Sequence, residues 1–294
     1  MQDPVSDKRG RVAAGALWAI GMALWLVVPA FGQAPPPKQA VQQPPPAGQA
    51  AGQPAAQNPA SDQPPVSKEE EDAYRAIYGL TAPQGQQIIS QSEDFLAKYP
   101  SSRYRTSVYS RLVTAYLNSH QNDKMIATAQ KAIAENPDNV DVLALVSTVI
   151  PRTIPDPRAL DAEQKLTEAE RYAKRAIELA SSLPKPDGVT EEQFTAAKNE
   201  KLGLAHYGLG LVYYMRGNST LSVPELEQAS RLDPRPEPLL FYLLGRGEIK
   251  LKKYPEALTA FDTCAKAQWD PQWQARCKSG ADEAKQAAAT AAKP

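Results

Sequence analysis

Apolar residues recur at intervals of three and four positions along most of the chain, from about Glu69 to Trp269. This spacing places apolar side chains on one face of a helix, so it predicts a succession of amphipathic helices. The helices pair into five hairpins, and the hairpin from Gly203 to Pro236 has the period of about 34 residues of a known helical repeat. Because one hairpin cannot bury its apolar face alone, the hairpins are expected to stack as an all-α solenoid. The weaker copies carry the pattern at Tyr109, Leu112, Val113, Tyr116, Met125, Ala129, Ala132, Phe241, Leu244, Gly245, Ala257, Phe261 and Cys264.

The strongest copy carries a sequence signature of its own. A small residue follows leucine in the run Leu209–Tyr213, a glycine marks the turn at Gly217, and Pro234 closes the unit. This pattern resembles the tetratricopeptide repeat family, clearly in the two hairpins from Gly203 onward and more loosely in the first three. The resemblance implies a right-handed α-α superhelix whose concave groove is lined by the first helix of each hairpin. The polar, alanine-rich stretch after Pro271 is expected to form a capping helix over the last apolar face.

Two interruptions depart from a regular repeat. The proline-rich stretch Pro151–Leu160 lengthens the turn inside the third hairpin, and residues 183–188 break the chain before the fourth. Thr190 and Gln193 then form a capping-box pattern that predicts a long helix ending near Met215. Insertions in solenoids often lie on one face and contact a ligand. The alternative is that both interruptions are loops whose growth the fold tolerates and that have no role in binding.

The beginning of the chain differs in composition from the rest. Residues 1–32 combine a basic start with an uncharged, mostly apolar stretch, which indicates a signal peptide cleaved before Gln33 or a retained membrane anchor. A cytosolic protein is the third alternative. Residues 33–66, almost wholly Ala, Pro, Gln and Gly, are expected to be a disordered linker to a folded domain over residues 67–294. We therefore expect an exported protein of the periplasm or cell envelope, either soluble or tethered to the membrane.

Charge and motifs argue against several classes of function. The 33 Lys and Arg residues balance the 33 Asp and Glu residues, so no net field attracts nucleic acid. His120 and His206 lie far apart, and neither has a histidine or cysteine at the spacing of a metal site. The chain lacks a glycine-rich phosphate loop, a Gly-x-Ser-x-Gly elbow and a His-Glu-x-x-His motif. The sequence therefore predicts a protein that is not an enzyme and needs no cofactor or metal.

The two cysteines, Cys264 and Cys277, fall on the last hairpin and on the capping helix. In an exported protein such a pair favours a structural disulfide, which would hold the terminal helix in place. The alternatives are two buried thiols and, with no Cys-x-x-Cys motif to support it, a redox role.

Family geometry also predicts where a partner binds. The groove of the last two repeats would present aromatic, apolar and cationic side chains, the residue types in which binding energy concentrates. The alternative is that some of these tyrosines pack against the neighbouring helix. The positions at which the family's carboxylate-clamping members use Lys and Asn do not match here, so an apolar peptide or helix is the expected ligand. The predicted groove residues are Tyr207, Leu211, Tyr214, Met215, Tyr242 and Arg246.

The sequence therefore favours a protein-interaction scaffold of the cell envelope. A self-assembling structural subunit, in which another copy fills the groove, is the alternative from a different class. An accessory factor for envelope or polysaccharide export would share the scaffold's mechanism and differ only in its partner.

Overall fold

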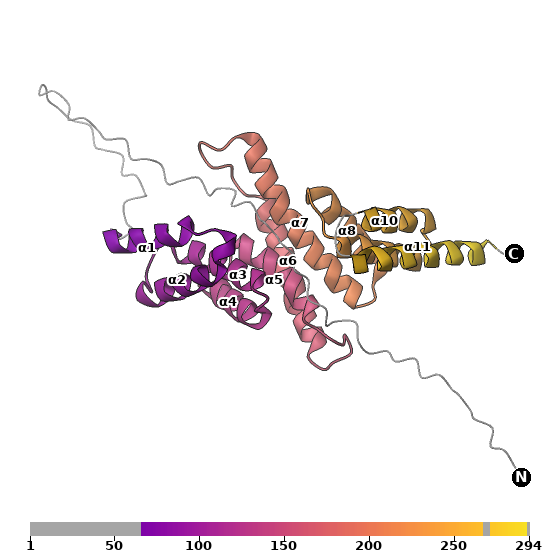
Figure 1. Cartoon of the computed structure of the whole chain (residues 1–294), viewed down its shortest axis with the longest axis horizontal. Helices are drawn as coiled ribbons and strands as arrows, with labels where there is room; N and C mark the ends of the chain where they lie inside the picture. Colours follow the sequence, from indigo (N-terminus) through magenta and orange to yellow (C-terminus); the bar gives the residue numbers. More distant parts are fainter. Residues whose placement is uncertain (1–65, 267–270, 293–294) are drawn as a thin grey trace, which may run out of the picture.

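The structure is a computed structural model that describes residues 66–266 and 271–292 (Figure 1). These residues form helices joined by short connections and contain no strand. The predicted leader or anchor over residues 1–32, residues 33–65 of the predicted 33–66 linker, and Trp269 lie outside the described residues. No helix within the described ranges has both the length and the apolar character needed to span a bilayer. The helices are α1 (Lys68–Gly79), the 3₁₀ turn η1 (Ala82–Gln84), α2 (Gly85–Lys98), α3 (Arg105–Asn118), α4 (Asn122–Glu135), α5 (Val140–Arg152), α6 (Ala162–Ser181), α7 (Glu191–Met215), α8 (Ser219–Leu232), α9 (Pro238–Lys250), α10 (Tyr254–Lys266) and α11 (Pro271–Ala291).

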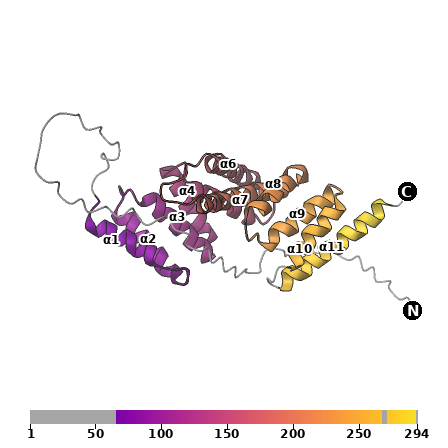
Figure 2. The same ribbon diagram turned by 90° about the horizontal axis from the view of Figure 1, so that it is seen from above.

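Consecutive helices pack against each other along the whole described chain, so α1 to α10 form five hairpins and α11 follows as a single helix. α5 also packs along α7, which joins the third hairpin to the fourth, and α9 packs along α11, which joins the fifth hairpin to the capping helix. Seen from above, the row of hairpins bends, so that its two ends lie on the same side of its middle (Figure 2). The predicted all-α solenoid is confirmed.

The turns inside three hairpins share one hydrogen-bond pattern. In each, the second residue after the helix has a positive φ: 57° at His120, 73° at Gly217 and 60° at Lys252. At Gly217, its N–H donates to the Tyr214 carbonyl at 2.9 Å, and the next N–H donates to the Tyr213 carbonyl at 2.9 Å. The other two turns repeat both bonds, which is the Schellman pattern that ends a helix at a left-handed residue. Equivalent turns in separate hairpins are direct structural evidence for a repeat.

The turn at Lys252 carries a conformational cost that the turn at Gly217 avoids. A left-handed conformation costs a residue with a Cβ about 1 kcal/mol relative to glycine. We therefore expect Lys252→Gly to raise the free energy of unfolding by up to about 1 kcal/mol. Lys253→Gly, one residue later at an ordinary φ, is the matched control and should lower it. Urea unfolding followed by circular dichroism measures both, and a destabilised Lys252→Gly would contradict the shared turn.

The long helix predicted before Met215 is confirmed. α7 begins after Thr190, whose hydroxyl accepts from the Gln193 N–H at 3.2 Å, while the Gln193 side chain accepts from the Thr190 N–H at 3.2 Å. In Figure 1 the loop between α5 and α6 lies at the lower edge of the molecule and the loop between α6 and α7 at the upper edge. The two interruptions of the repeat therefore do not share one end of the structure. Leu160, at the end of the first loop, is fully exposed.

Small residues set how closely the helices approach. A Cβ at position 210 would lie 2.7 Å from the side chain of Leu226 in α8, and one at position 245 would lie 2.8 Å from Phe261 in α10. Gly210 and Gly245 therefore allow the two helices of their hairpins to pack closely. Phe261 is fully buried and packs on Ala281 and Ala284 of α11. The predicted capping helix thus covers the apolar end of the last hairpin.

Candidate functional site

Two of the predicted groove residues lie in the core. Tyr207 and Leu211 on α7 are each only 5% exposed and pack with residues of α8 and α9, among them Val223 and Leu240. The cause is the position of α7, which contacts α5, α6, α8 and α9 and so has little free surface along its middle. The prediction that these two side chains line an open groove is therefore corrected: they pack against neighbouring helices, as the alternative stated.

Tyr207 belongs to a buried group that joins three helices. Arg152, the last residue of α5, forms an ion pair with Glu237, which directly precedes α9. The Arg152 guanidinium carbon lies 5.0 Å from the centre of the Tyr207 ring. Burial raises the pKa of Tyr207 well above its usual value, so the phenol stays neutral beside the ion pair. This group links the start of α9 to α5 and α7.

The other four predicted residues are half-buried, and three of them come together. Tyr214, Tyr242 and Arg246 gather where α7 meets α9, whereas Met215 packs on the separate core cluster around α5 and α6. Burial raises the pKa of Tyr214, and the nearby Arg246 opposes that rise. The ammonium of Lys250, one turn after Arg246, lies 5.6 Å from the centre of the Tyr214 ring.

The capping helix adds two residues that the sequence analysis assigned to no site. Trp273 on α11 meets the Tyr242 ring edge-on, with 5.9 Å between ring centres, and the guanidinium of Arg276 lies 5.2 Å from the Trp273 ring centre. Further along α11, Glu283 forms an ion pair with Arg246. The spacing of these three residues on α11 is the only signal that could have placed them on one side of a helix. We call the surface formed by Tyr214, Tyr242, Arg246, Lys250, Trp273 and Arg276 the α7–α9–α11 face.

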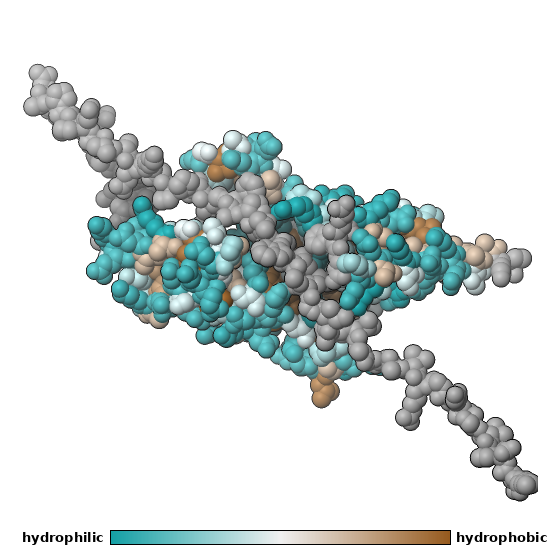
Figure 3. Space-filling model, in the orientation of Figure 1, coloured by the Kyte–Doolittle hydropathy of each residue, from teal (hydrophilic) through white to brown (hydrophobic). Residues whose placement is uncertain are grey.

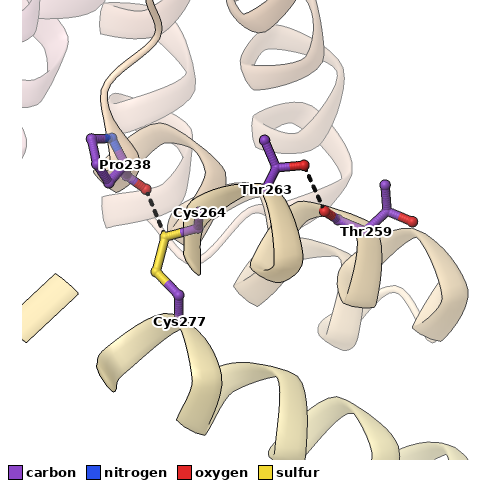
Figure 4. Close-up of a disulfide and its surroundings, with 5 residues drawn as sticks. All are labelled: Pro238, Thr259, Thr263, Cys264 and Cys277. Atoms are coloured by element: carbon purple, nitrogen blue, oxygen red, sulfur yellow. Dashed lines mark hydrogen bonds between the residues drawn. A yellow bond between two sulfur atoms is a disulfide. The ribbon is translucent and has the colours of Figure 1, made fainter. Parts of the chain in front are cut away.

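A disulfide holds α11 in register with this face. It joins Cys264 on α10 to Cys277 on α11, with 5.8 Å between the Cα atoms (Figure 4). The Cys264 sulfur also lies 3.2 Å from the carbonyl oxygen of Pro238, the first residue of α9. Cys277 directly follows Arg276 and lies one turn after Trp273. The disulfide therefore fixes the part of α11 that completes the face.

Removal of this disulfide should loosen α11. The cross-link closes a short loop, and a disulfide of this kind stabilises by a few kcal/mol. In Cys264→Ser/Cys277→Ser we expect amide hydrogen exchange in the first turns of α11 to accelerate by at least about tenfold, while α5 and α7 keep their protection. Exchange measured by mass spectrometry tests this expectation. Unchanged protection of α11 would show that packing on Phe261 alone holds the helix.

The acidic residues, cysteines and histidines of the described part of the chain are not arranged as a metal site. They form no group of three or more residues placed to bind a metal ion. His206 contacts Glu225 at 2.6 Å across the α7–α8 hairpin, and His120 is exposed in the turn described above. His206 therefore packs within a hairpin, whereas His120 faces solvent.

The five stacked hairpins, three of them with equivalent turns, decide the kind of fold. The chain is a tetratricopeptide-repeat-like solenoid. Comparison with solved structures finds matches at low identity and with TM-scores below 0.5. Similar structures include PilF of Pseudomonas aeruginosa (16% identity, TM-score 0.49, covering 76% of this chain and 90% of that one) and BtubC from P. vanneervenii (15%, 0.40, 76% and 89%). A tetratricopeptide repeat protein from Parabacteroides merdae is also similar (11%, 0.29, 74% and 100%).

These values describe a shared arrangement of helices and carry no information about partners. No protein-family model matches the sequence, and no curated protein matches it. The tetratricopeptide-repeat-like fold of this chain therefore provides the frame for a functional argument, and the residues of the α7–α9–α11 face must supply its chemistry.

Proposed function

We propose that this protein is a non-enzymatic interaction scaffold of the cell envelope that binds a peptide or helical segment of a partner protein on the α7–α9–α11 face. The observation that carries the proposal is the convergence of half-exposed Tyr214, Tyr242, Trp273 and Arg246 from three helices. Tyr, Trp and Arg are the residues that contribute most to binding when they sit together at the centre of an interface. A repeat fold with no metal cluster in its described part supports binding rather than catalysis.

The hydropathy of one side of the molecule supports a binding site confined to a few side chains. The side of the molecule shown in Figure 3 is mainly hydrophilic outside the grey atoms, with small separate hydrophobic spots. The part of this side that the grey atoms leave uncovered offers no broad apolar area for an obligate partner. A short segment bound by a few aromatic and cationic side chains suits this surface better than a large apolar interface. Export is proposed from the basic and apolar start of the sequence, with either a soluble or a tethered form.

Crosslinking in cells followed by purification tests the proposal. We expect the native chain to capture a partner that Tyr214→Ala/Tyr242→Ala fails to capture. Tyr254→Ala, at the start of α10 and outside the face, is the matched control and should capture the partner normally. Circular dichroism of each variant excludes unfolding. An unchanged set of partners in the double variant would move the search to the loop over residues 153–161.

Sedimentation velocity separates the scaffold from a self-assembling subunit. A chain that remains monomeric across a hundredfold range of concentration, about 1 to 100 µM, supports a site for another protein. Concentration-dependent dimers or larger species that Tyr214→Ala/Tyr242→Ala abolishes would show instead that a second copy occupies the face.

A further inference from the structure

We propose that the segment bound by the α7–α9–α11 face is acidic, with carboxylates that contact Lys250 and Arg276. This inference rests on the proposed function and specifies the chemistry of the partner. It replaces the apolar ligand expected from sequence, because Tyr207 and Leu211 of the predicted groove are buried and Met215 packs on a separate core cluster.

The charges on the face are unbalanced. Its cations are Arg246, Lys250 and Arg276, and Glu283 is the carboxylate that pairs with one of them. Among the described residues, no carboxylate lies within 4.0 Å of the Lys250 ammonium or the Arg276 guanidinium. The chain as a whole carries equal numbers of acidic and basic residues. Two cations without acidic partners on one face therefore mark a local excess of positive charge.

Within residues 66–266 and 271–292, Lys250 and Arg276 lie over aromatic rings and pair with no carboxylate. Lys250 lies over Tyr214, which belongs to a different helix, and Arg276 lies over Trp273 one turn before it. By contrast, Lys98, Arg103 and Arg171 each lie over the ring of the next residue in sequence. A cation over a ring keeps its full charge and its N–H donors for a carboxylate. The face thus presents oriented donors rather than mobile side chains.

Glu283 shows what a bound carboxylate would do. Its side chain is half-exposed and reaches across from α11 to the guanidinium of Arg246 on α9. A carboxylate of the partner would compete with Glu283 for the same donors. Glu283 therefore lowers the affinity of the face for an acidic ligand, and removal of its charge should raise that affinity. This sign is opposite to that expected for a residue that merely supports the fold.

Peptide display on the purified full-length chain tests the inference even before the partner is identified. A library of random peptides of about twelve residues, enough for two to three helical turns, is selected on the native chain. We expect the selected peptides to be enriched in Asp and Glu and to contain an apolar residue for the Tyr242–Trp273 pair. Their affinity should fall as salt rises from about 50 to 300 mM.

The affinity of four variants for one selected peptide measures the contribution of each charge. Lys250→Gln and Arg276→Gln should each weaken binding by about threefold to tenfold, whereas Glu283→Gln should strengthen it by about threefold. Lys285→Gln, on α11 and paired with Asp282 at 3.1 Å, is the matched control and should bind normally. Circular dichroism confirms that all four fold.

The outcomes separate the two proposals. Selected peptides that lack acidic residues but are lost with Tyr214→Ala/Tyr242→Ala would overturn the acidic ligand and leave the scaffold in place. No selected peptide, or peptides that bind the double variant equally well, would overturn both. A labelled single-stranded oligonucleotide that binds through Lys250 and Arg276 would show that the cations serve nucleic acid, and would also overturn the inference.

Discussion

Gly208→Ala is expected to lower the free energy of unfolding by about 2 to 3 kcal/mol, the upper part of the range for overpacked cores. Gly208 lies on α7 against Ser147 of α5, at the contact that joins the third hairpin to the fourth. A Cβ there would lie 2.2 Å from the Ser147 hydroxyl oxygen and 2.9 Å from its backbone carbonyl carbon. Rotation of the serine side chain removes the first contact but not the second. The two helices must therefore move apart.

The direction of this change is informative because the intrinsic preference points the other way. Alanine favours a helix over glycine by about 1 kcal/mol, so Gly79→Ala, where nothing lies within 4 Å of the added Cβ, should leave stability unchanged or raise it. Ser147→Gly should recover part of the loss in the Gly208→Ala background. Urea unfolding of the three variants measures these differences. A Gly208→Ala chain as stable as the native one would show that α5 and α7 do not need this close approach.

Glycine at this contact also shows what the sequence can and cannot predict. The repeat pattern identified the helices, the hairpins, the cap and the glycines at 210 and 245, because the spacing of apolar residues and the turn chemistry are local properties. Gly208 lies outside that pattern, since its role depends on a contact with Ser147, 61 positions earlier. Sequence periodicity does not specify such a pairing between helices of different hairpins.

The candidate site was only partly predictable for the same reason. Family geometry placed Tyr214, Tyr242 and Arg246 on a common surface, and the structure brings them together. It also placed Tyr207 and Leu211 there, although the length of α7 and its contacts with four helices bury both. Trp273 and Arg276 were assigned to the cap, because nothing in the sequence states that α11 lies along α9. The disulfide between α10 and α11 is the constraint that makes this placement specific.

Glu248→Gln is expected to stabilise the protein above neutral pH and to leave it unchanged in acid. Glu248 lies on α9 and is 4% exposed, and its Oε2 atom has no hydrogen-bond partner in the described part of the chain. Burial, with smaller contributions from Glu227 and Glu256, raises the pKa of Glu248 to about 7 from an ordinary 4.5. The folded state therefore disfavours the charged form, whereas the unfolded state accepts it.

The sign of the pH dependence follows from the two pKa values. Below pH 4.5 the carboxyl is protonated in both states and costs nothing. As pH rises from 4.5 to about 7, the unfolded chain loses the proton first, so the native protein becomes progressively less stable relative to the unfolded chain. Each pKa unit corresponds to about 1.4 kcal/mol, which gives a penalty of about 3 kcal/mol above pH 7. Glutamine has the same shape and no charge, so the variant should escape the penalty.

Urea unfolding at pH 4.5, 6 and 8, the range set by those two pKa values, measures the effect as a difference between the native chain and Glu248→Gln. The comparison removes the contributions of other carboxylates, which are present in both proteins. One of these is Glu170, whose burial raises its pKa but is outweighed by Arg216 and Lys174, which lower the pKa to about 2. Asp262→Asn, exposed on α10, is the control and should show no such trend. The gain of Glu248→Gln should be near zero at the lowest pH and largest at the highest. An equal gain at every pH would mean that Glu248 ionises normally, and that its buried position is hydrated or paired in solution.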